Sequence, residues 1–300
     1  MASVQLVPVG KRAGQRLDNF LLSHLKGVPR SRVYRMIRSG EVRVNGSRRR
    51  PSSRLEYNDQ VRIPPVRVAE KSKSAEAPRA WVETLRNAVL HEDANVIVIN
   101  KPVGIAVHGG SGESFGIAET LEQVFGNNDL QLAHRLDKAT SGCLVIVKDR
   151  KTLTAYHSAF RENEIKKTYD VIVEGTWLNS KTSVDAPLER FHLANGERRV
   201  RVSDVGQPSR TVFDVVAHRR VATWLAARPV TGRTHQVRVH TQYAGNPILG
   251  DRKYGNRKFQ PRAPRLMLHA RTLDLPDIGQ VEAPVPEEVL RFWDRLTTRD

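Results

Sequence analysis

The sequence predicts an α+β fold, with a mixed, mostly antiparallel central sheet in a large domain and a small basic domain in front. A length of 300 residues suggests about two domains. Helical and strand-like apolar patterns mix along the chain without the strict alternation that builds a parallel sheet. Positive charge is concentrated in the first 66 residues.

The composition narrows the class of protein. The formal charge of +17 favours an acidic partner, with nucleic acid first and an anionic membrane second. A single cysteine, Cys143, excludes a disulfide framework and is typical of a reducing cytoplasm. The N-terminus lacks the apolar segment of a signal peptide, and the runs at 96–99 and 144–147 are too short to span a bilayer. We therefore expect a cytoplasmic protein, not a membrane protein.

Residues 1–66 form the predicted basic domain. They hold 14 Lys and Arg against 4 Asp and Glu, a net +10, which leaves +7 of the total +17 for the rest. Helices are expected at 15–25 and 31–40, followed by a hairpin that turns at Asn45-Gly46 and a last strand before Pro64.

An arginine stripe runs along the second expected helix. Arg32, Arg35 and Arg38 recur every three residues and share one outer face. Such a stripe is often only a solvated surface, but few acids balance it here, which favours binding to nucleic-acid phosphates. The pattern "QRLDNFL…VPRSRVYRMIRSGEVRVNG" resembles the S4 RNA-binding domain.

Residues 67–80 are polar, lack apolar periodicity and are interpreted as a linker, so that the larger domain spans 81–300. Alternating or continuous apolar runs predict strands, and apolar residues at helical spacing predict helices. Strands are expected at 143–149, 166–175, 209–220, 222–230 and 265–275, helices at 114–125, 152–163 and 286–296, and a strand or helix after the turn at 232.

Several kinds of site find no support. The glycine-rich stretch 109–116 lacks the Gly-Lys-Ser/Thr ending of a phosphate loop and is interpreted as a mobile loop near a site. The histidines occur without an H-E-x-x-H motif or a cysteine cluster, so we expect no metal. No nucleophile elbow or dinucleotide fingerprint is present, and no cofactor is expected.

Two polar stretches remain. "AHRLDKATSG" (133–142) places Asp137 among basic residues directly before the expected buried strand. "GRTHQVRVH" (232–240) places Arg233 at a turn. If the two turns meet, Arg233 pairs with Asp137, keeps the carboxylate ionised and fixes its orientation for nucleophilic or base chemistry. The alternative is a surface turn with a structural ion pair.

These stretches together resemble the RluA-type pseudouridine synthases. The likeness continues through "KKTYDVIVEG", "PVTGRTHQVRVHTQYAG", "GDRKYG" (250–255) and "RLMLHA" (265–270), in order along almost the whole larger domain. The resemblance implies a cofactor-free isomerase, which detaches uracil from C1′ of a uridine, turns the base and rejoins it through C5.

The resemblance also implies roles for single residues. Asp137 matches the catalytic aspartate, which either attacks the nucleotide or removes the C2′ proton, and Arg233 matches its arginine partner. Tyr169 matches the tyrosine that stacks on the flipped base, Arg135 the arginine that fills the gap left by the base, and Leu268 a lining residue of the uracil pocket. Tyr169 and Leu268 also suit a plain core.

The function that follows is pseudouridine formation in 23S ribosomal RNA, free or in a pre-ribosomal particle, by a monomer. One alternative is the same chemistry on other ribosomal or transfer RNA uridines. Another is an RNA-binding assembly factor without catalysis, against which Asp137, Tyr169 and Arg233 argue together. A transcription factor is disfavoured because nothing indicates a symmetric dimer that reads half-sites.

Overall fold

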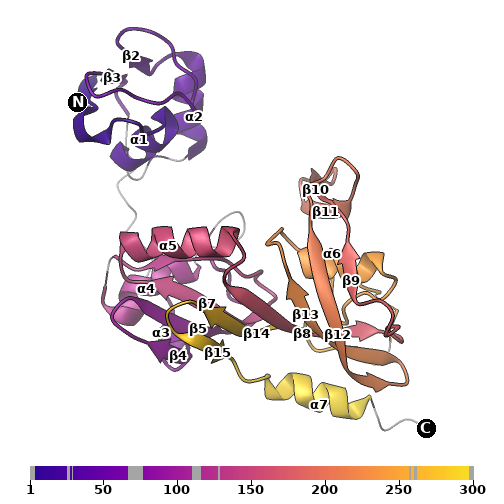
Figure 1. Cartoon of the computed structure of the whole chain (residues 1–300). Helices are drawn as coiled ribbons and strands as arrows, with labels where there is room; N and C mark the ends of the chain where they lie inside the picture. The colour runs from indigo at the N-terminus through magenta and orange to yellow at the C-terminus, as the bar shows by residue number, and fades with distance from the viewer. Residues whose placement is uncertain are drawn as a thin grey trace. The chain divides into compact units, whose positions relative to one another are not determined.

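In the computed structural model, the chain forms two compact units, Met1–Glu76 and Ala77–Asp300 (Figure 1). The structure describes residues 4–25, 28, 30–66, 77–109, 116–127, 129–256, 258–259 and 262–296. The glycine-rich stretch 109–116 and the first ten residues of the expected linker therefore lie almost wholly outside the described residues.

The first unit packs two helices on a three-stranded sheet of order β1-β3-β2. Its elements are β1 (Gln5–Pro8), a short 3-10 helix (Gly10–Arg12), α1 (Leu17–His24), α2 (Arg30–Ser39), β2 (Arg43–Val44) and β3 (Gln60–Ile63). The expected tight turn is present, since Asn45 and Gly46 have φ values of 49° and 77° and Val44 and Ser47 exchange backbone hydrogen bonds. Positive φ at both central residues is what a two-residue hairpin turn needs.

Apolar side chains from the helices and the sheet form the core of this unit. Phe20 and Leu21 on α1 and Met36 on α2 are fully buried against Val61 on β3. Asp18 is buried as well, but it accepts hydrogen bonds from Arg16 and from the Tyr34 hydroxyl. The acid thus ties the start of α1 to α2.

The second unit is built on a sheet with ten strands among the described residues, and of the strand pairs found there only β7 and β14 run parallel. The main order is β4-β5-β7-β14-β8-β13-β12-β9, with β15 beside β14 and β6 beside β7. The predicted mixed, mostly antiparallel sheet is confirmed. The strands are β4 (Val89–Glu92), β5 (Val96–Lys101), β6 (Gln131–Leu132), β7 (Ser141–Val147), β8 (Lys166–Glu174), β9 (Ser183–Asp185), β12 (Arg210–Arg219), β13 (Ala222–Pro229), β14 (Leu268–Leu275) and β15 (Gly279–Glu282).

Helices cover both faces of this sheet. They are α3 (Arg79–Arg86), α4 (Ile117–Phe125), α5 (Arg150–Arg161), α6 (Gln236–Tyr243) and α7 (Glu287–Arg295). Alternate side chains of β7 point to opposite faces. Leu144 and Ile146 pack with α3 and α4, whereas Cys143 and Val145 pack with α5. Burial on both faces explains why this strand reads as a continuous apolar run.

Close backbone packing holds β7 against β14. Gly142 has φ of +111°, and a Cβ atom at this position would lie 2.1 Å from the carbonyl oxygen of Ala270. No other residue fits without moving the strands apart. The glycine that ends "AHRLDKATSG" therefore lets the strand after Asp137 lie in the middle of the sheet.

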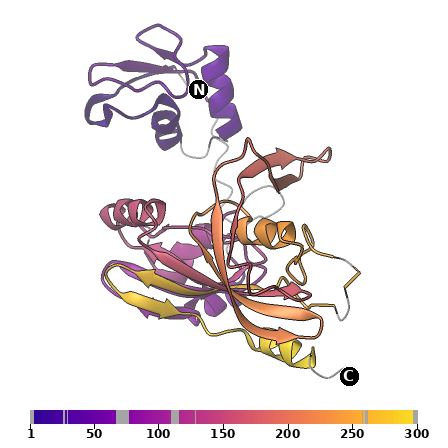
Figure 2. The same cartoon turned by 45° about the vertical axis from the view of Figure 1, so that its right-hand side comes forward.

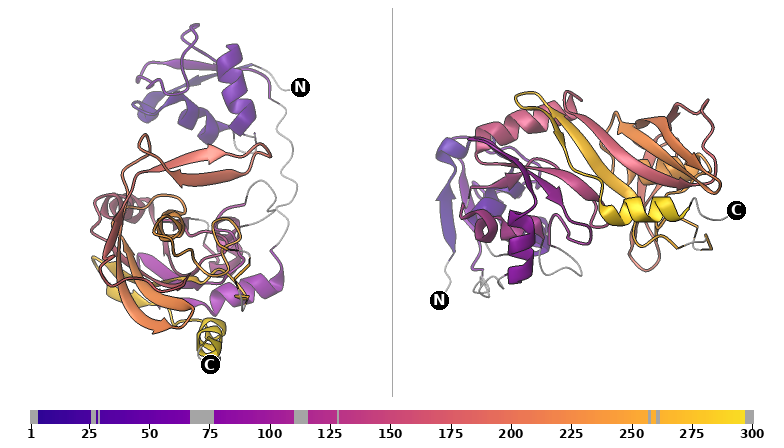
Figure 3. Two further views of the ribbon diagram at one scale, coloured as in Figure 1. Left: turned by 90° about the vertical axis from the view of Figure 1, so that its right-hand side faces the viewer. Right: turned by 90° about the horizontal axis from the view of Figure 1, so that it is seen from below.

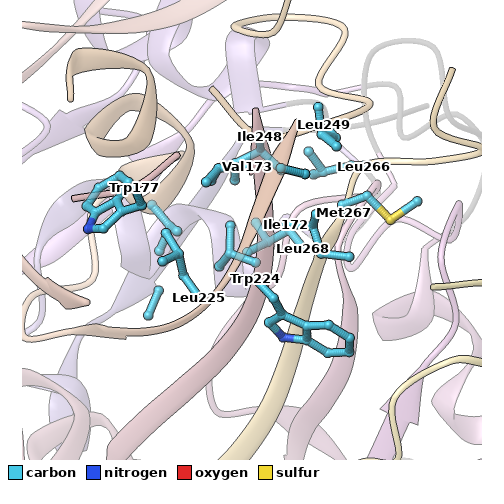
Figure 4. Close-up of a cluster of buried hydrophobic side chains, with 14 of the residues drawn as sticks. Ile172, Val173, Trp177, Trp224, Leu225, Ile248, Leu249, Leu266, Met267 and Leu268 are labelled. Carbon is cyan, nitrogen blue, oxygen red and sulfur yellow. The ribbon is translucent and has the colours of Figure 1, made fainter. Parts of the chain in front are cut away.

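A large apolar cluster fills the other half of the unit (Figure 4). Leu268 and Ile172 lie in it, and α7 closes it from one side, where Trp293 meets the Trp224 ring edge-on at 5.4 Å. The view from below shows α7 lying along the sheet (Figure 3).

The structure adds elements that the sequence analysis does not predict. Helix α3 begins at Arg79, inside the expected linker, because Ala77 is already anchored by a hydrogen bond to Gln123 of α4. Strands β10 (Leu188–His192) and β11 (Arg198–Val202) form a separate two-stranded hairpin. This hairpin projects from the body of the second unit (Figure 2).

Candidate active site

Asp137 lies in a tight turn directly before β7. Its carbonyl oxygen accepts a hydrogen bond of 3.0 Å from the amide of Thr140, and the next carbonyl, of Lys138, accepts one of 2.9 Å from Gly104. The second bond joins the turn to the loop after β5. A carboxylate at the end of a fully buried strand is held rigidly, as a reacting group requires.

A buried lysine ties the same two loops together. Lys101, at the end of β5, is 0% exposed, and its Nζ donates to the carbonyl oxygens of Pro102 and Ile105 at 2.8 Å and of Lys138 at 3.4 Å. Burial lowers the pKa of Lys101 to about 7, and the nearby charge of Arg265 adds to this effect. No sequence motif singles out this residue.

The start of β7 is fixed by a second buried network. Arg265 donates to the Ser141 hydroxyl at 2.6 Å, and this hydroxyl lies 2.8 Å from Nδ1 of His269. Nε2 of His269 lies 3.2 Å from the carbonyl oxygen of Ala283, an atom that can only accept. Neutral His269 therefore carries its proton on Nε2, and burial lowers its pKa to about 4.

The guanidinium that faces Asp137 belongs to Arg238. Nη1 of Arg238 donates to Oδ2 of Asp137 at 2.9 Å, while Nε and Nη2 donate to the two oxygens of Asp251 at 2.7 and 2.8 Å. The side chains of Arg238 and Asp251 are 6% and 0% exposed, and that of Asp137 is 20% exposed. One carboxylate is thus sealed in the core, and the other reaches solvent.

These contacts shift both groups of the buried pair. Burial lowers the pKa of Arg238, but the hydrogen bonds and charges of Asp251 and Asp137 outweigh it and raise that pKa above its usual value. Burial raises the pKa of Asp251, but Arg238 and the backbone amides of Lys253 and Tyr254 together lower it below its usual value. Arg238 is therefore permanently charged, with a fixed orientation toward Asp137.

The expected pairing of Asp137 with Arg233 is wrong. Within the described residues, Arg233 forms no ion pair with Asp137, and its Nε donates to the carbonyl oxygen of Pro208 at 3.3 Å. The reason is the start of α6 at Gln236, whose side chain caps the turn by accepting from the amide of Arg233 at 3.0 Å. Arg233 precedes the helix and is exposed, while Arg238 lies on its buried face.

His235 also faces Asp137, with its Nε2 atom 3.7 Å from Oδ2. Its φ of 54° is a left-handed conformation that costs a residue other than glycine about 1–3 kcal/mol. The Tyr254 hydroxyl accepts from the amide of Val200 at 3.0 Å and lies 2.7 Å from Nδ1 of His235. This contact holds the imidazole ring in place beside Asp137. Burial lowers the pKa of His235 to about 4.

The other expected site residues have distinct settings. Tyr169, on β8 between Ala227 and Ala270, is half-buried, and burial together with the charge of Asp137 raises its pKa. Arg135 is exposed on the segment that enters the Asp137 turn. Leu268 is buried in the apolar cluster of Figure 4. The structure thus brings Tyr169 near Asp137.

The arginine stripe of the first unit is partly engaged. Arg32 makes two hydrogen bonds to Glu41, at 2.8 and 3.2 Å, and Nε of Arg38 donates to the carbonyl oxygen of Tyr34 at 3.3 Å. Arg35 and Arg38 are exposed, and Arg32 is half-buried. Arg35 and Arg38 therefore present the more accessible charges of α2.

Neither a metal-binding cluster nor a membrane-spanning helix is found among the described residues. No three His, Cys, Asp or Glu side chains come together there as a metal would need. No helix in the same part of the chain has the length and apolar character to cross a bilayer.

Comparison with known proteins places the chain. The family model for RNA pseudouridylate synthase matches residues 95–243, and the S4 domain model matches residues 15–61. A protein named ribosomal large subunit pseudouridine synthase C, from Escherichia coli K12, is 47% identical over 98% of this chain and 97% of its own length. The chain belongs to the RNA pseudouridylate synthase family. The resemblance that the motifs suggest is confirmed, and so is an isomerase activity.

Other members of the family are similar to this chain in sequence and in structure. A relative of the same name from Haemophilus influenzae is 45% identical over 97% of this chain and 91% of its own length. The solved structure titled human RNA pseudouridylate synthase domain containing 4 is 28% identical, with a TM-score of 0.61, over 72% of this chain and 95% of that one. Within this family, the acid before β7 and the arginine of α6 become the reacting centre to be tested.

Proposed function

We propose that this synthase isomerises specific uridines of 23S ribosomal RNA to pseudouridine, as a cytoplasmic monomer that acts without a cofactor. The names of its full-length relatives support a large-subunit RNA substrate. The first unit, about residues 1–66, binds RNA with an S4-like surface that includes Arg32, Arg35 and Arg38, and the second unit, from about residue 81, carries the chemistry.

One observation carries the proposal for the reacting group. Asp137 is a partly exposed carboxylate held at 2.9 Å by an arginine that a second, fully buried acid fixes in place. Such an acid stays in position while a nucleotide enters and leaves. It is suited to attack the nucleotide, or to remove a proton from its sugar, without rearranging its own surroundings.

The neighbouring side chains suit the remaining steps. Tyr169 is half-buried near Asp137 with a raised pKa, so it stays neutral, with a ring that can stack on a base and a hydroxyl that can donate a proton. Arg135 is exposed and long enough to fill the space that a flipped uridine leaves, which offsets part of the few kcal/mol of unstacking. Leu268 would supply apolar surface at the uracil.

The test compares the wild type with Asp137→Asn on unmodified 23S RNA transcript, with EDTA present and no cofactor. Pseudouridines are mapped by carbodiimide-blocked reverse transcription. We expect stops from the wild type alone and unchanged RNA affinity in the variant, because the substitution keeps the size of the side chain. Equal stops from both proteins would remove Asp137 from the reaction.

The same assay tests the substrate. Stops at transfer RNA or at other ribosomal uridines, but not in 23S RNA, would reassign the target while leaving the chemistry intact. Tight binding without any stops would favour an assembly factor or a pre-ribosomal particle as the substrate.

A further inference from the structure

A cavity of about 180 Å³ lies at the foot of the β10–β11 hairpin. Leu188, Arg190 and Val200 line it from the hairpin, residues 205–207 line it from the following turn, and Arg233 and Thr234 line it from the turn before α6. Its volume is far above the roughly 10–15 Å³ that a single water needs. The hairpin projects from the body of the second unit, as Figures 1 and 2 show, while its foot packs on Tyr254.

Two guanidinium groups with unused donors border this cavity. Among the described residues, Arg190 is exposed and makes no hydrogen bond or ion pair through its side chain. Arg233 donates one hydrogen bond, from Nε to the carbonyl oxygen of Pro208 at 3.3 Å, and both of its terminal nitrogens remain available. The lining contains one acid, Glu189, but it accepts from Arg201 at 3.0 Å, so the cavity keeps a positive charge.

The cavity is connected to the Asp137 site by direct contacts. Arg190 shares a hairpin face with Leu188, which packs on Tyr254, and the Tyr254 hydroxyl contacts His235. Arg233 lies two residues before His235, a span of at most about 7 Å along the chain. A group bound between the two arginines is therefore close to a nucleotide held at Asp137.

We propose that this cavity binds a backbone phosphate of the RNA next to the target nucleotide, through Arg190 and Arg233. The inference deepens the function proposed above and rests on it. Guanidinium groups bind phosphate oxygens through paired N–H donors, and two of them facing one cavity suit one anion better than a base edge. Contacts of this kind set the register of a nucleic acid on a protein and carry no sequence information.

The assignment gives Arg233 a role that its position allows. A phosphate anchored beside the site would hold the strand while the uridine leaves its stack. The hairpin would then serve as a clamp arm, because Arg190 is fixed in register opposite Val200 on the two-stranded sheet.

The test measures RNA affinity against salt for Arg190→Gln, Arg233→Gln and the double variant. The matched control is Arg220→Gln, an exposed arginine in the turn between β12 and β13. It is separated from Arg233 by the whole of β13, a strand about 25 Å long at ~3.3 Å per residue. We expect the double variant to bind about 10- to 100-fold more weakly. Its slope of log affinity against log salt should fall by about 0.7–0.9, the value of one phosphate, and the control should match the wild type.

Substrates with a single uncharged methylphosphonate beside the target uridine identify the contact. At one position the substitution should weaken the wild type as much as the double variant is weakened on normal RNA, and it should cost the double variant nothing further. Full additivity at every position, or wild-type affinity in the double variant, would overturn the proposal. Absence of pseudouridine formation by the wild type would instead remove the function on which the proposal rests.

Discussion

Arg238→Met should destabilise the second unit strongly, because it removes the charge between two carboxylates. Arg238 makes hydrogen bonds of 2.7 and 2.8 Å to Asp251, whose side chain is 0% exposed. Breaking a buried ion pair from one side leaves an uncompensated charge in the core and costs about 3–5 kcal/mol. Folded domains are stable by only about 5–15 kcal/mol, so this loss is a large fraction of the total.

A double variant separates the charge effect from lost packing. Arg238→Met with Asp251→Asn removes both buried charges, so it should be more stable than Arg238→Met alone by about 0.5–3 kcal/mol. Arg238→Lys keeps a charge but cannot reach both acids with a rigid fork, so it should still lose most of the pseudouridine formation. The double variant should also stay inactive, because Asp137 has lost its partner.

The assay is urea unfolding followed by tryptophan fluorescence. All 4 tryptophans lie in the second unit, so the signal reports on that unit. Single-turnover pseudouridine formation is measured in parallel at low urea. A loss of less than about 1 kcal/mol in Arg238→Met, or no gain in the double variant, would refute the idea that a buried charge network holds the site.

Four further predictions follow from the same structure. Lys101 has a pKa of about 7 in the folded chain against a usual 10.5, so the unfolded chain binds the extra proton between these values and stability should rise with pH there. The free energy of unfolding of the wild type, measured by urea titration, should rise relative to that of Lys101→Met by up to about 1.4 kcal/mol per pH unit over this range. Gly142→Ala should cost about 1–3 kcal/mol or more, measured by thermal unfolding, because the new Cβ strikes the backbone of β14. Tyr254→Phe removes the hydroxyl beside Nδ1 of His235 but leaves the ring buried, and burial is what lowers its pKa to about 4, so the single-turnover rate profile should gain no acid limb between pH 5 and 7; a new acid limb would show that the hydroxyl, and not burial, keeps His235 neutral. Deleting residues 1–66 should weaken RNA binding and its salt dependence more than the rate at saturating RNA, and the opposite split would place the first unit in the chemistry.

Local patterns predict most of the fold, because the spacing of apolar residues within each helix or strand shows which of its faces is buried. The continuous apolar run of β7 indicates burial on both faces, and the acid before it marks the site. The same logic finds both helices and the Asn45-Gly46 turn of the first unit. The β10–β11 hairpin is not among the predicted elements, although Asn195-Gly196 between two strand-forming segments is a strong hairpin signal.

The choice between Arg233 and Arg238 shows where local reasoning ends. Both arginines lie in "GRTHQVRVH", and the turn favours the first. Which of them reaches Asp137 depends on where α6 begins, and that depends on the capping contact of Gln236 with the chain around it. A buried arginine also needs acceptors, so the acid in "GDRKYG", Asp251, was the available signal for Arg238.

The two carboxylates that bind Arg238 have different roles, because Asp251 is buried and Asp137 is partly exposed. Asp251 is sealed in the core, accepts two bonds from Arg238 and two from backbone amides, and has no access to a substrate. Asp137 shares the same guanidinium through a single bond and keeps part of its surface open. An acid bound twice to one arginine is a fixed support, whereas an acid bound once can exchange part of its bonding for a nucleotide. Asp251→Asn should therefore lower the rate through the position of Arg238 while leaving RNA affinity unchanged, and a loss of affinity equal to the loss of rate would contradict this division.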